Sequence, residues 1–364
     1  MNILFLTTHL NIGGITSYIV TLGKGLVEKG HRVYIASSGG DLVAALPSMG
    51  IGHVSIPIKT KQEFSFKVAR SFFALRGVIK EKNISLVHSH TRVTQILGCL
   101  IQRYCHVPCL STCHGFFTPK FSRKVFPCWG RKVIAISESV KEHLINDFGV
   151  REDRVRLIHN GIDVFRFNAF KDEDKIRIKK TLGLKEEPVV GIVARLSDVK
   201  GHKYLIEAMK GVLAVYPGVQ LLIAGDGRMK EELVRLVKSE GIQENTYFLP
   251  TVADTVEVLT AIDIFVMPSL KEGLGLSLME AMACGLPVIG SEVGGIKSLI
   301  QQGVNGVLVQ PAQSAGLSRA ILDLLKDTGK AASLGARARD FIAHNFSQER
   351  MVKETEEVYL ECVR

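Results

Sequence analysis

The 364-residue sequence has no apolar run of the roughly 18–20 residues that a membrane-spanning helix needs. Its first residues, MNILFLTTHLNIGG, lack a basic lead-in and are typical of a first buried strand rather than a signal peptide. We therefore expect a cytoplasmic protein. With 46% hydrophobic residues, a chain of this length can bury a large core and is expected to form two domains.

Paired cysteine motifs are also missing. The seven cysteines lie mostly in strand-like or helix-like stretches, which indicates reduced, buried thiols. Three of them cluster with two histidines between residues 105 and 114, but Pro108 interrupts any shared helix and no zinc-type pair spacing occurs. We predict no metal site there.

Acidic residues are absent between Lys82 and Ser137. The stretch from Lys59 to Ser137 holds 14 Lys and Arg against two acids, a net charge of +12, whereas the rest of the chain holds 32 Lys and Arg against 34 acids. A charge run usually marks only a solvated face. An excess confined to one part of one half instead indicates an anionic surface or partner.

What the sequence does contain is a pattern that occurs twice. Short β-rich runs alternate with helical stretches, which is typical of parallel sheets with crossover helices. The predicted strands are NILFLTT, RVYIAS, SLVHSH, CLSTCHG, KVIAIS and VRLIHNG in the first half, and PVVGIVAR, VQLLIAGD, TYFLPT, IFVMPS, PVIGS and GVLVQ in the second. The pattern predicts an α/β protein with two Rossmann-like, doubly wound parallel-sheet domains facing each other across a cleft.

The charged stretch FKDEDKIRIKKTLGLKEEP sets the domain boundaries because it is poor in apolar residues. We predict a first domain over residues 1–165, a connector over 166–187 and a second domain over 188–345. The tail, 346–364, has helical spacing and is expected to pack across the junction and join the first domain.

Two acids bracket a glycine turn in KEGLGLSLMEAMACG. Glu272 precedes Gly273 and Gly275, and Glu280 lies in the helix that follows. Glycines let backbone N–H groups approach a ligand, and a helix N-terminus adds roughly half a positive charge, so a phosphate fits there. Glu280 suits the vicinal hydroxyls of a ribose, and Glu272 suits a second sugar beyond a diphosphate. A helix-start acid and a loop charge are the simpler interpretation of the two acids taken alone.

The loop VARLSDVKG adds two cations after another strand, with Arg195 at the strand end and Lys200 five residues later. A guanidinium and an ammonium suit a pyrophosphate, and they can stabilise a nucleoside diphosphate leaving group without a metal. The turn AGDGR (224–228) ends a further strand and is expected to form a wall of the site.

These motifs resemble the donor half of GT-B glycosyltransferases of family 4, which are retaining enzymes that use nucleotide sugars. The motifs concerned are ARLSDVKG, AGDGR, EGLGLSLME and ACGLPVIGSEVGG. The first half is similar too, through GGITSYIVTLGKGLVEKGHRVYIAS, HSH, TCHG, AISESVKEHL and HNGIDVFRF. The resemblance covers nearly the whole chain.

The resemblance implies a role for each matching residue of the second half, taken as the domain that binds the nucleotide sugar. Arg195 and Lys200 would bind the diphosphate, and Glu280 the ribose. Glu272 would hold hydroxyls of the transferred sugar, with N–H groups of Leu274 and Gly275 donated near it. Two positions depart from the family pattern: Pro250 follows TYFL and Ala194 precedes Arg195, where glycine is common.

In the first half, taken as the acceptor domain, the resemblance places Gly13 and Gly14 in a loop that closes over the phosphates and sugar. It places His114, which ends the strand CLSTC, beside the reacting centre as a catalytic-site residue. A lone histidine near an apolar segment is more often structural, and the resemblance favours the functional interpretation. His88 and His90 are left as candidates for the cleft.

The reaction that the resemblance implies is a retaining front-face substitution without a metal or other cofactor. The departing phosphate would help to deprotonate the acceptor hydroxyl, and Glu272 would orient and stabilise rather than attack. A UDP-sugar is the expected donor. A cell-surface glycan or lipid-linked acceptor is expected, as in polysaccharide or lipopolysaccharide biosynthesis.

Two basic segments contain interleaved aromatic residues, 59–82 and 114–132. They indicate docking to an anionic membrane surface, peripheral to the inner face of the cytoplasmic membrane. Stacking on nucleic acid would use the same residue types, but a sugar-transfer site has no evident use for it, and we predict no nucleic-acid partner. An ordinary helix pair with buried Phe is the structural alternative.

Other enzyme classes remain as alternatives. GLGLSL imitates a dinucleotide-binding motif, but Leu278 stands at its third glycine and the two cations would have no role. A metal-dependent D-x-D could be spelled by residues 172–174, which lie in the charged connector rather than at a strand end. A glycosyl phosphorylase on the same fold and a non-catalytic sugar-nucleotide-binding protein are the remaining candidates.

Overall fold

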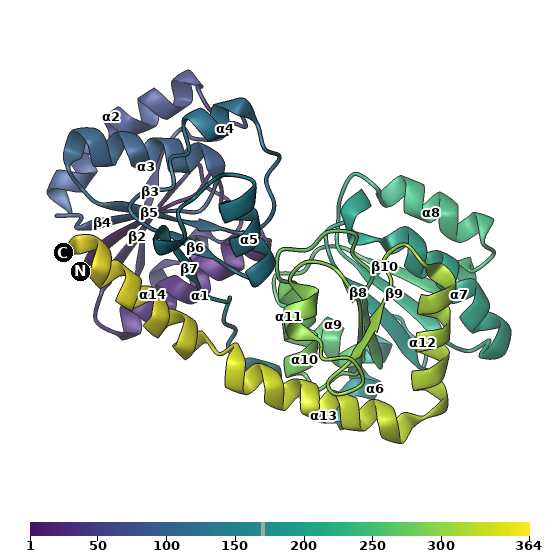
Figure 1. Cartoon of the computed structure of the whole chain (residues 1–364). Coiled ribbons are helices and arrows are strands. Elements are labelled where there is room, and N and C mark those ends of the chain that lie inside the picture. The colour runs from purple at the N-terminus through teal and green to yellow at the C-terminus, as the bar shows by residue number, and fades with distance from the viewer. Residues whose placement is uncertain (169–171) are drawn as a thin grey trace. The chain divides into compact units, whose positions relative to one another are not determined.

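The computed structural model describes residues 1–168 and 172–364. The chain divides into two compact units, Met1–Gly161 with Gln348–Arg364, and Ile162–Ser347. Each unit is built on one parallel sheet with helices on both faces (Figure 1). The predicted connector, 166–187, falls within the second unit and contains helix α6 (Asp172–Thr181), while its residues 169–171 lie outside the described residues.

The first unit contains a seven-stranded sheet in the order β3-β2-β1-β4-β5-β6-β7. Its strands are β1 (Asn2–Leu6), β2 (Arg32–Ser37), β3 (Ile51–Ser55), β4 (Leu86–Ser89), β5 (Cys109–Cys113), β6 (Val133–Ala135) and β7 (Val155–Leu157). The sequence pattern predicted six of them and missed β3. This strand lies at the sheet edge and pairs only with β2. It is also partly exposed and contains Gly52, so it lacks the apolar run of a central strand.

Helices cover both faces of this sheet. They are α1 (Gly14–Glu28), α2 (Phe66–Glu81), α3 (Arg92–Cys105), α4 (Phe121–Val125), α5 (Glu138–Asn146) and α14 (Gln348–Val363). Ile3 and Phe5 of β1 belong to a buried cluster with residues of α1 and α14. The alternate residues Leu4 and Leu6 belong to a second cluster with residues of α2 and α3. The alternation of strand side chains therefore gives the first unit two cores, one on each face.

The second unit contains a six-stranded sheet in the order β10-β9-β8-β11-β12-β13. Its strands are β8 (Val189–Val193), β9 (Gln220–Ala224), β10 (Thr246–Leu249), β11 (Ile264–Met267), β12 (Val288–Ser291) and β13 (Val307–Val309). All six were predicted from the sequence. The strand order reverses beside β8, which places the loops after β8 and β11 next to each other at the carboxyl edge, where open parallel sheets bind ligands.

Helices α7 (His202–Val215), α8 (Lys230–Ser239), α9 (Val256–Ala261), α10 (Leu276–Ala283), α11 (Ile296–Leu299), α12 (Ser314–Lys326) and α13 (Thr328–Asn345) complete the second unit. Its buried cluster joins α7, α8 and α12 to the strands. The prediction of an α/β protein with two Rossmann-like parallel-sheet domains is confirmed.

The helices of the described residues include none with both the length and the apolar character to span a bilayer. The cysteines are free thiols. Cys109, Cys113 and Cys362 are buried as predicted, whereas the other four are half-buried.

Helix α14, the last helix in the sequence, lies beside α1, the first helix (Figure 1). A Cβ atom on Gly25 of α1 would lie 2.5 Å from Cγ2 of Val352, a side chain that is itself fixed in α14. This close approach requires glycine at position 25.

We predict that Gly25→Ala lowers the free energy of unfolding by about 1–3 kcal/mol, because α14 must move away from α1. In the matched control, Gly77→Ala in α2, the added Cβ meets no atom within 4 Å. It is expected to be neutral or to stabilise by up to about 1 kcal/mol through helix propensity. Urea unfolding measures both variants, and equal effects would contradict the packing argument.

Candidate active site

Arg195 and Lys200 lie on the loop that follows β8, and Lys200 ends a short 3-10 turn, Asp198–Lys200. Gly201 then begins α7 with a left-handed φ of 71°. A Cβ on Gly201 would lie 1.9 Å from the carbonyl oxygen of Pro268, just after β11. The glycine thus lets the β8 loop pack directly against the β11 loop.

Lys200 and Glu272 form an ion pair across these two loops. Nζ of Lys200 lies 2.5 Å from Oε2 of Glu272, and the hydroxyl of Ser269 donates to the same oxygen at 3.3 Å. The two charged side chains are 20% and 12% exposed. A pair so shielded from water depends on both partners, because either charge left alone would lack solvation. The structure therefore brings together two predicted site residues that are 72 positions apart.

The glycine turn between the two acids ends at the N-terminus of α10. Gly275 is the N-cap residue, with a left-handed φ of 101°, and Leu274 before it is 1% exposed. The backbone N–H of Gly295 donates to the carbonyl oxygen of Glu272 at 3.1 Å. This bond fixes the turn, so that its backbone and the carboxylate of Glu272 are held in place together.

Arg195 is exposed and, among the described residues, has no hydrogen-bond or ion-pair partner. Its loop is attached to the turn AGDGR after β9, because the N–H of Leu196 donates to the carbonyl oxygen of Asp226 at 2.9 Å. A Cβ on Gly225 would lie 2.1 Å from the carbonyl oxygen of Ala194. The predicted wall thus contacts the loop that carries the free guanidinium.

Asp226 extends this wall to the loop after β10. Its carboxylate accepts from the N–H of Thr251 at 2.8 Å, and this hydrogen bond is the main reason why its pKa lies below the usual value. The N–H of Gly225 donates to the carbonyl oxygen of Leu249, the residue before Pro250. Pro250 therefore lies where the β9 and β10 loops meet.

Glu280 is in the second turn of α10 and contacts a different set of residues from Glu272. The hydroxyl of Thr255 donates to its Oε2 at 3.0 Å, and the ion pair between Arg166 and Asp254 lies nearby. Burial raises the pKa of the Glu280 carboxyl to about 7, although the Thr255 hydrogen bond and Arg166 act against it. Glu280 therefore changes charge near neutral pH.

In the first unit, Gly13 is the N-cap of α1 and Gly14 is its first residue. A Cβ added to either glycine would meet no atom within 4 Å. No acidic residue lies in the first turn of this 15-residue helix. The space before the positive end of the α1 dipole is open, as a loop that approaches phosphates requires.

His114 follows β5 at the carboxyl edge of the same sheet. Its ring packs edge-on against Tyr18 of α1, with centroids 4.8 Å apart. Its Nε2 lies 3.2 Å from Nδ1 of His90. Burial lowers the pKa of His114 to about 3, so the imidazole is neutral at physiological pH.

His88 and His90 are buried, at 0% and 1% exposure, so they are not cleft-facing side chains. Nδ1 of His88 is 2.6 Å from the hydroxyl of Tyr359 in α14, and its Nε2 is 2.8 Å from Oγ1 of Thr112. His90 stacks on His88 with centroids 4.1 Å apart, and its Nε2 has no partner among the described residues. His90 contacts His114 directly, and His88 packs against His90, so the two rings support His114 from the buried side.

Three supporting contacts were not predicted from the sequence. Ser269 ends the strand IFVMPS, so its position at a strand end was a usable signal. Thr255 and Tyr18 gave no local signal, because they reach Glu280 and His114 only through the tertiary fold.

The basic segments 59–82 and 114–132 meet on the first unit. Glu63 accepts from Arg123 at 3.0 Å and from Arg92 at 3.2 Å, and the rings of Phe64 and Phe126 lie 6.1 Å apart. Trp129, one of the aromatic residues of segment 114–132, is only 4% exposed. Its indole packs among neighbouring rings, those of Phe117 and Phe148, instead of facing solvent.

We predict that Glu280 makes stability fall as pH rises. The folded state keeps its proton up to about pH 7, whereas the ordinary pKa is 4.5. The contribution is therefore fully present below pH 4.5 and is lost as pH rises through about 7, amounting to on the order of 3 kcal/mol.

Urea unfolding between pH 4.5 and 8 should show this loss in the wild type and not in Glu280→Gln. Glu257→Gln, at an exposed position of the neighbouring helix α9, removes one carboxylate as a control and should follow the wild-type profile. Parallel profiles for the wild type and Glu280→Gln would contradict the assignment.

Comparison with known proteins extends these observations to the whole chain. Residues 174–341 match the family described as Glycosyl transferases group 1, and residues 12–166 match Glycosyltransferase Family 4. The N-acetyl-alpha-D-glucosaminyl L-malate synthase of Bacillus anthracis is 26% identical over 378 residues, which cover 99% of this chain and 97% of that protein. The UDP-Gal:alpha-D-GlcNAc-diphosphoundecaprenol alpha-1,3-galactosyltransferase of Escherichia coli is 27% identical over 325 residues, which cover 85% of this chain and 83% of that protein.

Solved structures give the same result for the fold. HepE of Anabaena, crystallised in complex with UDP-glucose, superposes with a TM-score of 0.88 at 23% identity, covering 99% of this chain and 100% of that chain. The two family matches occupy consecutive parts of the chain, in the order that the sequence motifs predicted. The chain belongs to the family 4 glycosyltransferases and has their GT-B fold.

Proposed function

We propose that this glycosyltransferase moves a sugar from a UDP-sugar to a lipid-linked or cell-surface glycan acceptor, with retention of configuration and without a metal cofactor. The observation that carries the proposal is the ion pair between Lys200 and Glu272. Lys200 lies on the same loop as Arg195, whose guanidinium has no partner among the described residues. One compared protein is named for UDP-Gal and another was crystallised with UDP-glucose, which supports the choice of donor.

The donor diphosphate is assigned to the β8 loop. Arg195 offers a guanidinium that suits two phosphate oxygens at once, and Lys200 adds an ammonium held by Glu272. As the bond between the anomeric carbon and the phosphate oxygen breaks, negative charge develops on the diphosphate. Fixed cations stabilise that charge without reorganisation during the reaction.

The transferred sugar is assigned to Glu272 and the turn that ends at Gly275. A carboxylate already bound to an ammonium and a hydroxyl is a weakened nucleophile, which favours an orienting role over covalent attack. The acceptor oxygen then bonds to the anomeric carbon from the face that the diphosphate leaves, and its proton passes to the departing phosphate oxygen.

His114 is assigned a position beside the sugar as a neutral hydrogen-bonding group. With a pKa of about 3, it carries no proton to give as an acid at neutral pH. Glu280 is assigned the ribose. Its carboxyl, with a pKa near 7, can accept from or share a proton with vicinal hydroxyls.

The acceptor is assigned to a membrane surface because the first unit exposes aromatic side chains within its basic stretch. Phe64, Phe66, Phe73, Phe121 and Phe126 are exposed by 70, 80, 67, 83 and 54%. They lie in the stretch whose net charge is +12. Exposed aromatic rings among cations suit the headgroup region of an anionic bilayer. One of the two relatives is named for a malate and the other for a lipid diphosphate, so this surface, rather than the family, supports the choice.

We predict that the full-length protein slowly hydrolyses one or more UDP-sugars in a mass-spectrometric panel of UDP-, GDP- and ADP-sugars and sugar phosphates. Turnover of sugar phosphates alone would favour a phosphorylase, and binding without turnover would favour a sugar-nucleotide-binding protein.

In the same assay, Lys200→Ala and Glu272→Ala should each reduce kcat/KM by roughly 10²–10³-fold while the protein stays folded. Lys203→Ala removes a nearby exposed cation that pairs with Glu207 and should remain within about twofold of the wild type. Wild-type turnover in either of the first two variants would refute the assigned roles.

We also predict that the protein floats with phosphatidylglycerol vesicles at low salt and dissociates as salt is raised. Phe121→Ser should weaken binding by roughly 10- to 100-fold, since a buried Phe contributes roughly 1.5–3 kcal/mol. Phe165→Ser, at a 79% exposed position of the second unit, is the control. Failure of the wild type to float would overturn the membrane proposal.

A further inference from the structure

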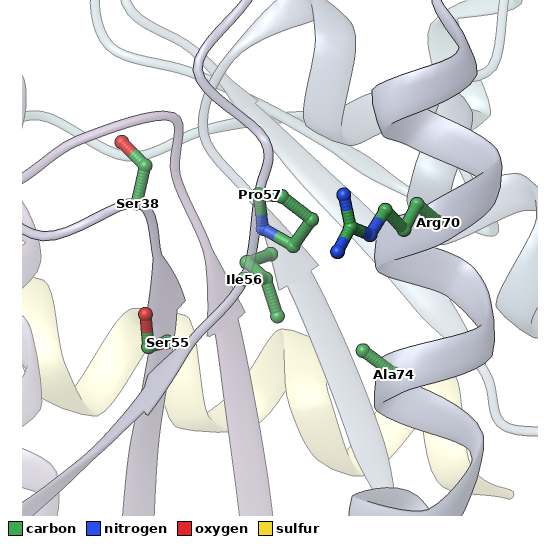
Figure 2. A pocket seen from close by; sticks show the side chains of 6 residues that line it. All are labelled: Ser38, Ser55, Ile56, Pro57, Arg70 and Ala74. Atoms are coloured by element: carbon green, nitrogen blue, oxygen red, sulfur yellow. The ribbon is translucent and has the colours of Figure 1, made fainter.

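A cavity of about 430 Å³ opens at the carboxyl ends of β2 and β3 in the first unit. Figure 2 shows Arg70 reaching from α2 toward Pro57, with Ser38 and Ser55 at the ends of the strands across from it. Ile56 and Ala74 complete the lining. The cavity lies at the sheet edge where open parallel sheets bind ligands, yet none of its residues belongs to the site described above.

The charge of the cavity comes from Arg70. This exposed guanidinium has no hydrogen-bond or ion-pair partner among the described residues, and no acidic residue lines the cavity. The acids closest in sequence on either side are already engaged: Glu63 pairs with Arg92 and Arg123, and Glu81 pairs with Lys82. Arg70 therefore offers its full positive charge and its fork of N–H donors to a ligand.

The hydroxyls of the cavity differ in what they offer. Ser38 already donates to the carbonyl oxygen of Thr8 at 2.7 Å, so it serves as a fixed wall. Ser55 has no partner among the described residues and can donate to a ligand. The guanidinium and the free hydroxyl can both donate hydrogen bonds, and the guanidinium adds a positive charge, which suits an oxyanion.

Hydrogen bonds link this cavity to the glycine loop before α1. Besides the bond from Ser38 to Thr8, the N–H of Leu10 donates to the carbonyl oxygen of Gly39 at 2.9 Å. The N–H of Ile12 donates to Asp41 at 3.2 Å. The segments 8–12 and 38–41 thus form one hydrogen-bonded unit, which begins at the cavity wall and ends beside Gly13. A molecule anchored at Arg70 can extend along this edge toward Gly13 and the start of α1.

The surroundings indicate what the anion is attached to. Phe66 and Phe73 lie four residues before and three residues after Arg70 on α2, which places them on the same side of the helix. Both rings are exposed, by 80% and 67%. An anion with an apolar chain would place its charge on Arg70 and its chain along these rings.

We propose that this cavity is a phosphate-binding subsite that holds the phosphate ester of an amphiphile, either the phosphate that links a glycan acceptor to its lipid or the headgroup of a membrane phospholipid. The inference rests on the proposed function and names the chemical class that its acceptor half recognises. In this subsite Arg70 binds two phosphate oxygens, and the hydroxyl of Ser55 donates a third hydrogen bond to the phosphate.

The test uses the full-length protein and follows the backbone amides of Ser55 and Ile56 by NMR, so that phosphate binding in the second unit is observed separately. The first probe is butyl phosphate, a soluble phosphate ester. Arg70→Gln should weaken its binding about tenfold or more, as expected for loss of a charge-assisted bidentate contact. The control, Arg76→Gln, removes the same charge from an exposed position of the same helix that does not line the cavity, and should bind like the wild type.

A second arm distinguishes the sources of phosphate, using flotation with phosphatidylglycerol vesicles. Selective loss of butyl phosphate binding in Arg70→Gln, with vesicle binding equal in the two variants, assigns the subsite to an acceptor phosphate. If Arg70→Gln also binds vesicles more weakly than Arg76→Gln, the subsite is assigned to the phosphate of a phospholipid headgroup.

Two results would overturn the subsite: no shift of the Ser55 and Ile56 amides in the wild type with millimolar butyl phosphate, or equal weakening in both variants, which would indicate only general surface charge. Donor hydrolysis by the wild type is measured in parallel. If it is present while the subsite fails, the proposed function stands and only this inference falls.

Discussion

The carboxyl edge of the second unit depends on one ion pair, between the ammonium of Lys200 and the carboxylate of Glu272. The pair exists because β8 and β11 are neighbours in the sheet, so the loops at their carboxyl ends meet although they are distant in sequence. Partial burial makes each charge dependent on the other, and Gly201 lets the backbones approach closely enough for the contact. The ammonium of Lys200 is thereby fixed in direction on the same loop that carries Arg195.

In the first unit, by contrast, burial keeps three histidine side chains uncharged. Burial holds the pKa values of His88, His90 and His114 far below the usual histidine value. The pairing of Phe5 with His88 in the sheet register places the first of these rings in the core, where Thr112 and Tyr359 satisfy both of its nitrogens. A neutral polar chain of this kind holds His114 through His90 without adding charge at this edge of the sheet.

The fold could largely be predicted from the sequence because central parallel strands are continuous apolar runs, and twelve such runs were visible. The edge strand β3 escaped because Gly52 and its partial exposure remove that signal. In the site, strand-end positions and glycine spacing predicted Arg195, Lys200 and Glu272. No local pattern reports that Glu280 faces Thr255 or that Trp129 is covered by Phe117 and Phe148, since those contacts form only when distant segments pack.

The return of the last helix to the first unit has a consequence for biosynthesis. The second unit is continuous in sequence, whereas the first lacks α14 until the whole second unit has been made. Before then, the core around Ile19 and Leu22 is uncovered on one side and His88 lacks the hydroxyl of Tyr359. On the ribosome, the half of the chain that is translated first is therefore the half that finishes folding last.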